Sequence, residues 1–499
     1  MRKWMGFACL MLNVSVCVTG LGRASELKID YATYLGGNQW EEAREIIAYP
    51  DGSVLVGAHV CSGGLPTTGG CFQANYAGDD PALGPGGIIG GDLYLARLSA
   101  DGGRVLAATY FGGSKQERSV YGMELDHNGN IVVACLTRSA DAPTTPGCFQ
   151  PKSGGDVDML VAKLSPDLTH LIWCTYVGGA AGESPRGGLA LDTDDNVVVV
   201  GTSPSRDFPT TPGVVQPKLK GPRDSVIVKL KSDGSGLVFG TFLGGTGEDD
   251  AIMGARLDTA GNIYIAGHTQ SADFPVTAGA PQPKFGGQSD CYLAKLSPEG
   301  SRLLYATYLG GKGNEFAEHR PWLTPDGCFI LVGPTQSADF PTTEGAYQRE
   351  QRGAGDGFVT KLSAGGKRFV FSTRIGGAGT ENLLMPTVDE KGNIWVVGNT
   401  GSRDFPVTPD ALQGTFGGGQ EDGLLAVLSP DGSKLLYATY LGGSGEEMIR
   451  SITFGLKGEV YLVGNTSSPD FPTTPGARQP KLGGNRDAFI IKLVAGLSG

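Results

Sequence analysis

The sequence predicts an all-β protein, a single seven-bladed β-propeller of four-stranded blades, and three observations lead to this prediction. A strand that ends in Gly-Gly recurs seven times, an Asp followed by an alternating apolar run recurs in step with it, and the two chain ends hold complementary parts of one unit. No part of the repeat has helical periodicity. Together these features predict a closed ring of small sheets.

The repeat keeps a constant length along the chain. Its first Gly recurs after 76 residues once and then after 66 residues five times, at Gly36, Gly112, Gly178, Gly244, Gly310, Gly376 and Gly442. The second marker follows the same interval, at Asp92, Asp158, Asp224, Asp290, Asp356, Asp422 and Asp487. Two markers in step indicate one structural unit repeated seven times.

Each unit contains four short apolar runs separated by turn residues. In the fourth unit these runs cover 252–258, 263–268, 291–296 and 302–309, and we expect them in that order from the axis to the rim. The first run is rich in Gly in several copies, which suits crowding near a narrow axis. A solenoid or a row of sandwiches is the competing architecture, but a solenoid needs polar caps at both ends and the sequence has none.

The two ends of the chain predict how the ring closes. The first strand, 27–35, is of the fourth type, and the last, 488–493, is of the third type with no fourth strand after it. We therefore expect the first strand to complete the last blade and remove its open edge. The predicted blades are 41–111, 117–177, 183–243, 249–309, 315–375, 381–441, and 447–493 with 27–35.

Composition limits the possible partners. The chain has 499 residues, with 40 Lys and Arg against 51 Asp and Glu, and no basic stripe. A nucleic-acid partner would require such a stripe, so none is expected. Gly, at 81 residues, and Pro, at 30, separate apolar runs rather than forming a low-complexity tract. A monomer is expected.

The N-terminus resembles a secretory signal peptide. Arg2 and Lys3 precede an uncharged, mostly apolar stretch, and Gly22 and Ala24 provide small residues before a cleavage site that would make residues 1–24 the signal. An uncleaved anchor is the alternative, because the stretch is almost long enough to span a bilayer. No later segment is apolar enough to cross a membrane. We expect a secreted, periplasmic or cell-surface protein.

Seven cysteines follow the predicted cleavage site. Two pairs flank equivalent loops of the first two blades, and in an oxidising compartment they predict two disulfides, Cys61–Cys71 and Cys135–Cys148. Cys174, Cys291 and Cys328 lie within strand patterns and are expected to be buried thiols. Their spacing does not match a zinc site.

Three phrases of the repeat resemble the SBBP (seven-bladed β-propeller) repeat family of secreted and cell-surface proteins. They are Tyr-Ala-Thr-Tyr-Leu-Gly-Gly, Asp-Phe-Pro-Thr-Thr-Pro-Gly-Ala and Asp-Ala-Phe-Ile-Ile-Lys-Leu, and the resemblance covers residues 27–493. It implies the propeller fold and an extracellular location, and it carries no catalytic residues. The first repeat departs from the pattern, since its loop lacks the Asp-Phe pair and is enlarged at 77–91.

An acidic residue follows the first Gly of each corner by five positions: Glu41, Glu117, Glu183, Asp249, Glu315, Glu381 and Glu447. Seven carboxylates around one mouth of the channel could bind Ca²⁺, which prefers oxygen ligands. Alternatively, each carboxylate accepts hydrogen bonds from the backbone of its own corner. A residue present in every blade is better explained by a need that every blade shares, so the second interpretation is favoured.

The positions that differ between blades are better candidates for function. Three residues after each acid the blades carry Arg44, Val120, Arg186, Ile252, Glu318, Leu384 and Arg450. We expect a ligand site near the axis that uses Arg44, Arg186, Arg450, Tyr121, His319 and Arg320, and arginines and aromatics there would suit an anionic or sugar ligand. The alternative is that these arginines pair with neighbouring acids.

No sequence signature of an enzyme is present. The five histidines are scattered, and no nucleophile elbow, metal-spaced His pair or phosphate loop occurs. The sequence therefore favours a non-catalytic module that binds or scaffolds an extracellular protein or glycan. A glycan-active hydrolase or lyase using axial carboxylates is the alternative. It would be recognised by an unmatched acid pair with perturbed pKa values in an axial pocket.

Overall fold

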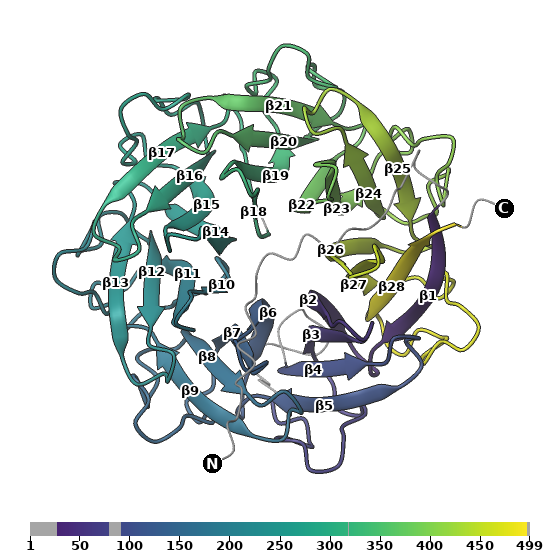
Figure 1. Ribbon diagram of the computed structural model, residues 1–499, viewed down its shortest axis with the longest axis horizontal. Coiled ribbons are helices and arrows are strands. Elements are labelled where there is room, and N and C mark those ends of the chain that lie inside the picture. Colours follow the sequence, from purple (N-terminus) through teal and green to yellow (C-terminus); the bar gives the residue numbers. More distant parts are fainter. Residues whose placement is uncertain (1–26, 79–90, 318, 497–499) are drawn as a thin grey trace, which may run out of the picture.

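The computed structural model describes residues 27–78, 91–317 and 319–496, and this part of the chain forms the predicted propeller. Seven antiparallel sheets of four strands each stand around a central axis (Figure 1). No helix long and apolar enough to cross a membrane occurs among the described residues. Residues 1–24, the predicted signal peptide, lie outside them, as does most of the enlarged loop at 77–91.

The two inner strands of each blade form a hairpin. We number the blades 1 to 7 from the first inner strand. The innermost strands are β2 (Glu41–Ala48), β6 (Glu117–Leu125), β10 (Leu189–Leu191), β14 (Asp249–Leu257), β18 (Trp322–Leu323), β22 (Glu381–Val388) and β26 (Glu447–Phe454). The second strands are β3 (Val54–Val60), β7 (Ile131–Thr137), β11 (Val197–Ser203), β15 (Ile263–Thr269), β19 (Phe329–Thr335), β23 (Ile394–Thr400) and β27 (Val460–Thr466).

The two outer strands pair in the same antiparallel way. The third strands are β4 (Asp92–Leu98), β8 (Asp158–Leu164), β12 (Asp224–Leu230), β16 (Asp290–Leu296), β20 (Asp356–Leu362), β24 (Asp422–Leu428) and β28 (Asp487–Ala495). The outermost are β5 (Val105–Phe111), β9 (Leu171–Val177), β13 (Leu237–Leu243), β17 (Leu303–Leu309), β21 (Phe369–Ile375), β25 (Leu435–Leu441) and β1 (Leu27–Leu35). The predicted order from axis to rim is confirmed.

The predicted ring closure is also confirmed. β1 pairs antiparallel with β28, from Leu27 opposite Ala495 to Leu35 opposite Ala488, and so completes blade 7. Figure 1 shows the first and last strands side by side at the rim. Because β1 covers the edge of β28, the last blade has no unpaired third strand.

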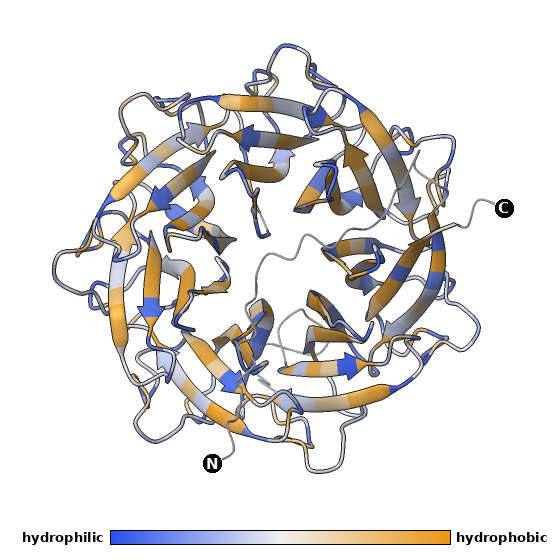
Figure 2. Ribbon diagram, in the orientation of Figure 1, coloured by the Kyte–Doolittle hydropathy of each residue, from blue (hydrophilic) through white to orange (hydrophobic). Residues whose placement is uncertain are grey.

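Local sequence explains the hairpins. In blade 4 the carboxylate of Asp258 accepts hydrogen bonds from the backbone N–H groups of Ala260 (3.1 Å) and Asn262 (2.9 Å), and Gly261 takes the positive φ of 76° that closes the turn. Apolar residues concentrate in the strands and hydrophilic ones in the connecting loops (Figure 2). Blades 3 and 5 differ, because Pro185 and Pro321 leave their innermost strands only two or three residues long.

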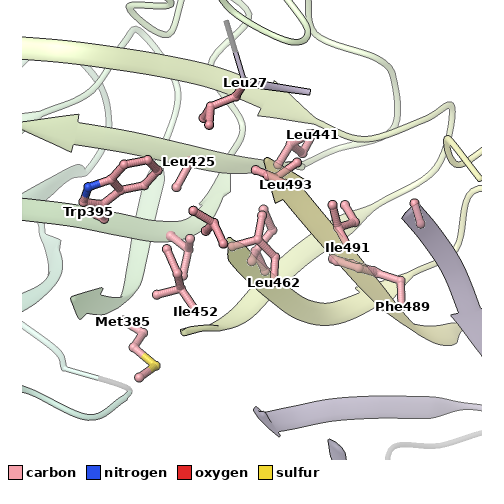
Figure 3. Close-up of a cluster of buried hydrophobic side chains, with 14 of the residues drawn as sticks. Leu27, Met385, Trp395, Leu425, Leu441, Ile452, Leu462, Phe489, Ile491 and Leu493 are labelled. Atoms are coloured by element: carbon pink, nitrogen blue, oxygen red, sulfur yellow. The ribbon is translucent and has the colours of Figure 1, made fainter. Parts of the chain in front are cut away.

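The core lies between neighbouring blades. Figure 3 shows one such layer, in which Trp395 and Leu425 of blade 6 face Ile452 and Leu462 of blade 7. A four-stranded blade cannot bury both faces alone, so each depends on its neighbours. The stacked blades therefore hold the inner strands at fixed positions around the axis.

Candidate functional site

The seven repeated acids lie inside their own corners. The Oε2 atom of Glu41 accepts a hydrogen bond from the backbone N–H of Gly37 (2.9 Å), and its Oε1 accepts one from the Ser62 hydroxyl (2.8 Å). Glu117 does the same with Gly113 (2.7 Å) and Thr137 (2.6 Å). Both carboxyls are fully buried, and burial raises the pKa of each to about 7.

This geometry matches the structural interpretation of the acids. Each carboxylate uses its oxygens on backbone and hydroxyl donors of one corner. Within residues 27–78, 91–317 and 319–496, no three carboxylate, histidine or cysteine side chains come together as metal ligands. The acids therefore offer Ca²⁺ no converging ligand set there, although oxygen ligands of this kind could otherwise suit it.

The two predicted disulfides are wrong in this structure, because none of the four cysteines forms a disulfide. Cys135 is buried in the core between blades, where β7 directs it. Cys148 lies in a loop that folds onto β9. Its N–H donates to the carbonyl of Thr145, and the N–H of Thr145 donates to the carbonyl of Cys174 in β9. The sequence pattern places the two cysteines on either side of one loop. It does not show that the strand and the loop that carry them pack against different neighbours.

Cys61 and Cys71 are likewise tied to different elements. The backbone N–H of Cys61 donates to the carbonyl of Trp40 (3.0 Å), at the start of blade 1. Phe72, next to Cys71, donates instead to the carbonyl of Leu168, at the rim of blade 2. Spacing along the chain could not reveal this difference.

β-bulges occur at the position that varies between blades. The pairing of β2 with β3 shifts register between Ala43 and Glu45, which makes Arg44 the extra residue of a β-bulge. The same shift makes Leu384 the extra residue in β22 and Arg450 the extra residue in β26. A bulge re-aims the side chain of the extra residue. Each of these blades thus has one residue whose side chain the bulge redirects. The residue type at this position differs between the blades.

The bulged arginines join an ion network at the axis. Glu42 of blade 1 forms ion pairs with Arg450 of blade 7 and with Arg44 (3.8 Å). Arg44 also donates from Nη2 to the Nε2 atom of His319, in blade 5, over 3.1 Å, and lies 5.2 Å from the ring centroid of Tyr121 in blade 2. Residues from four blades thus belong to one network.

Arg320 extends the network toward the other mouth. Its Nη1 atom lies 2.7 Å from Glu124 of blade 2, and its Nε atom lies 3.4 Å from Glu45 of blade 1. Arg256 of blade 4 lies 3.9 Å from Glu124 and donates from Nε to the carbonyl of Pro321 (3.0 Å). The short strand β18 lets the preceding loop approach the axis far enough for these contacts.

We call this set the axial cluster: Glu42, Arg44, Glu45, Tyr121, Glu124, Arg256, His319, Arg320 and Arg450. Five of the six residues predicted as ligand-binding belong to it. The sixth, Arg186, is close enough to lower the pKa of His319 electrostatically. Arg186 is only half-buried and has no ion-pair partner in the described part of the chain. Four arginines face three glutamates in the cluster, so its charge balance favours an anion.

The pKa values of the two buried glutamates of β2 are shifted in opposite directions. Burial opposes the ionisation of Glu42, but Arg450 and Arg44 outweigh burial and lower its pKa. Burial raises the pKa of Glu45 to about 7, because Arg320 only partly offsets it and Glu124 adds repulsion. The pair is therefore an ionised carboxylate and a carboxyl that exchanges its proton near neutral pH.

His319 is neutral in this setting. Burial and then the charge of Arg44 hold its pKa well below the ordinary value of 6.5. Because the guanidinium of Arg44 can only donate, Nε2 of the imidazole is the acceptor and Nδ1 carries the proton. His319 thus offers a neutral N–H donor next to arginines.

Sequence reasoning did not assign Glu42, Glu124 or Arg256 to the site. Glu124 and Arg256 stand seven residues after the repeated acid, at a second position that differs between blades, where Trp322 is the blade 5 residue. A comparison of the blades at that position could have found them. Glu42 has no such signal apart from its place beside the bulge.

A cavity opens beside the cluster between blades 2, 3 and 4. Its volume is about 330 Å³, and it lies at the turn ends of β6, β10 and β14, away from the Gly-Gly corners. Arg256 and His127 form part of its wall. Three carboxylates also line it, and each has a basic partner: Glu124 with Arg320, Asp192 with Lys229 and Asp195 with His127. The cavity is thus the place where the axial cluster reaches a ligand-sized space.

Comparison with known proteins identifies no family. No family model and no curated protein matches this chain. Among solved structures, a protein of unknown function from Dyadobacter fermentans is 12% identical, with 94% of this chain and 100% of that chain covered and a TM-score of 0.44. A quinohemoprotein alcohol dehydrogenase from Pseudomonas putida is 13% identical, with 96% and 77% covered and a TM-score of 0.42. One from Comamonas testosteroni is 9% identical, with 94% and 76% covered and a TM-score of 0.44.

These comparisons change one prediction and leave another without confirmation. The prediction of a non-catalytic binding or scaffold module is contradicted, because propellers among the matches are named as dehydrogenases. Neither that prediction nor its glycan-active alternative is carried forward. At such low identity the likeness concerns the fold, and no reaction or cofactor is transferred. The seven-bladed propeller stands, whereas no family model supports the finer SBBP assignment.

Proposed function

We propose that this chain is an enzyme whose active site is the axial cluster, and that it moves a proton on a small organic anion. The observation that carries the proposal is the pair Glu42 and Glu45, two buried carboxyls three residues apart whose pKa values are shifted in opposite directions. Opposite shifts give the two groups different roles, because Glu42 stays charged while Glu45 exchanges its proton. The excess of arginine supplies the attraction for an anion.

Each group has a role in this proposal. The arginines of the axial cluster bind the carboxylate or phosphate of the substrate. Glu45, in its ionised form, takes a proton from the carbon next to a carbonyl group, and the bonding electrons move to the carbonyl oxygen. The N–H of His319 and the guanidinium of Arg44 stabilise that oxyanion. Where the deprotonated carbon also carries a hydroxyl group, Glu45 returns the proton to the former carbonyl carbon while the hydroxyl proton passes to the oxyanion. The net reaction is then the isomerisation of a hydroxy carbonyl compound.

The experiment is a proton-exchange assay in D₂O. Small keto and hydroxy acids and their phosphate counterparts are incubated with the protein, and loss of the carbon-bound proton is followed by NMR. We expect exchange with at least one anion and a rate that rises with pH through about 7 as Glu45 ionises. Glu45→Gln should reduce the rate by about 10²-fold or more.

The matched control is Glu299→Gln, at an exposed turn of blade 4, which should exchange like the parent protein. Exchange that survives in Glu45→Gln would remove Glu45 from the mechanism. Absence of exchange with every anion would sink the proposal as a whole.

We also propose that the chain is exported and belongs to the SBBP repeat family. The basic and apolar N-terminus supports export, and the three repeated phrases support the family. Detection of the mature N-terminus at Ser25 in material secreted by the source cells would test the first point. Retention of the intact N-terminus in a membrane fraction would contradict it.

A further inference from the structure

We infer that the cavity between blades 2, 3 and 4 is the substrate's binding pocket and that the substrate is a hydroxylated organic anion. Arg256 holds its anionic group and His127 accepts a hydrogen bond from one of its hydroxyls. The inference rests on the proposed function for the reacting centre, but the binding it describes can be measured without catalysis.

The cavity has the size and lining of a small-ligand site. Its volume of about 330 Å³ lies at the lower end of the range for ligand pockets. Leu125, Leu191 and Leu257, the last residues of three adjacent innermost strands, provide an aliphatic floor. A carbon chain would pack on this floor while polar groups meet the rim (Figure 1 shows the three strands together).

Arg256 is the cation best placed to hold the ligand's anion. The hydrogen bond from its Nε to the Pro321 carbonyl fixes the guanidinium, and the nearest carboxylate, Glu124, is 3.9 Å away. Burial, followed by repulsion from Arg320, lowers the pKa of Arg256 to about 10. A bound carboxylate or phosphate would offset that repulsion, and the fork of Nη donors suits either group.

His127 is a second polar residue in the lining of the cavity. Its Nδ1 lies 2.7 Å from Oδ1 of Asp195, and its backbone N–H donates to the same atom over 3.2 Å. The carboxylate accepts, so Nδ1 carries a proton, and in the tautomer that this bond selects Nε2 keeps its lone pair. The side chain is 47% exposed, and within the described residues Nε2 has no protein partner. A ligand hydroxyl fits this acceptor.

Asp195 is retained at a position where the fold favours glycine. It has a φ of 58°, and the six other blades place Gly at the same turn position: Gly52, Gly129, Gly261, Gly327, Gly392 and Gly458. A side chain in the left-handed region costs stability, although Asp tolerates it better than most residues. Because Asp195 holds the His127 ring, the strained residue is explained as a positioning residue for ligand binding.

The first test is calorimetric titration with gluconate, a hydroxylated carboxylate. We expect gluconate to bind, and glucose, which lacks the charge, and hexanoate, which lacks the hydroxyls, to bind at least about tenfold more weakly. Arg256→Gln and His127→Ala should each weaken gluconate binding by about tenfold. Glucose 6-phosphate tests which anionic group the substrate carries. If it binds more tightly than gluconate, the group is a phosphate, and if it binds more weakly, the group is a carboxylate.

The second test uses Asp195→Gly, which restores the glycine of the repeat. We expect this variant to unfold at a higher temperature than the parent and yet to bind gluconate about tenfold more weakly. Lys361→Gln, in a second cavity between blades 5 and 6, is the control and should bind gluconate like the parent.

Two outcomes overturn the inference: gluconate and glucose 6-phosphate both fail to bind, or Asp195→Gly and Arg256→Gln bind as tightly as the parent. Glu45→Gln distinguishes this result from a failure of the proposed function. Normal gluconate binding by the parent and by that variant, with no proton exchange in either, would leave the pocket intact and remove only the proposed reaction.

Discussion

Arg374 is the residue that departs most from its repeat. It is fully buried in β21, where the other blades carry Tyr34, Tyr110, Tyr176, Phe242, Tyr308 and Tyr440. Its Nη2 donates to the carbonyl of Ser337, as the hydroxyl of Tyr308 does to Ser271 (2.7 Å). The Nε and Nη1 atoms have no hydrogen-bond partner within the described chain, and Asp356 is 3.9 Å from Nη1. A buried charge so poorly compensated costs stability.

We therefore predict that Arg374→Tyr stabilises the protein by about 1–3 kcal/mol. The hydroxyl would keep the bond to Ser337, and Asp356 would keep its bonds from Gln348 (2.8 Å) and the Arg352 backbone (3.1 Å). Urea unfolding should show a higher midpoint with an unchanged slope. The reverse change in blade 4, Tyr308→Arg, should lower the midpoint. A lower midpoint for Arg374→Tyr would show that Arg374 is better accommodated than its contacts suggest.

Among the elements, β1 is the strand that closes the ring. Besides its ladder with β28, the hydroxyl of Tyr34 donates to the carbonyl of Ser468 (2.6 Å), and the N–H of Thr474 donates to the carbonyl of Ala32 (3.1 Å). Leu27 and Tyr34 also belong to the core shared by blades 6 and 7. The strand therefore joins the chain's two ends and covers the last blade's edge.

Deletion of residues 1–35 should lower the thermal midpoint by roughly 10 °C or more, because it exposes the edge of β28 and opens the core of blade 7. The matched control begins at Leu27 and retains β1. Scanning calorimetry measures the midpoint, and light scattering should detect association of the deleted form through its open edge. Equal midpoints for the two variants would show that the ring is stable without its closing strand.

At the scale of the whole molecule, buried acids with raised pKa values affect the pH dependence of stability. Burial raises the pKa of Glu41, Glu117 and Asp290 to about 7 and that of Asp249 to about 6. Between pH 4.5 and 7 the folded protein keeps these protons while the unfolded chain has released them. The folded state then binds more protons, so stability falls as pH rises.

The thermal midpoint should thus be higher near pH 5 than near pH 8 at constant ionic strength. Glu117→Gln removes one titrating group while keeping an acceptor for the Gly113 N–H, and should flatten the decline. Calorimetry across this range measures both proteins. A midpoint that rises from pH 5 to pH 8 would contradict the account.

The sequence by itself determined the architecture. The 66-residue period, the four apolar runs of each unit and the complementary chain ends are local signals that every copy repeats, and together they specified the blades, the strand order and the closure through 27–35. The same period separated structural residues, such as Glu41 and Glu117, from variable ones such as Arg44 and Arg450. Five of the residues singled out at or near the variable positions lie in the axial cluster.

Only the tertiary structure decided which side chains meet. Arg44 and His319 are 275 residues apart, and their contact depends on a bulge in β2 and on the shortness of β18. Cys135 and Cys148 form no disulfide, because a strand directs Cys135 into the core while a loop carries Cys148 to β9. The opposite pKa shifts of Glu42 and Glu45 arise from charges on distant blades. Local patterns encode the blade, but contacts across the axis are encoded only in the closed ring.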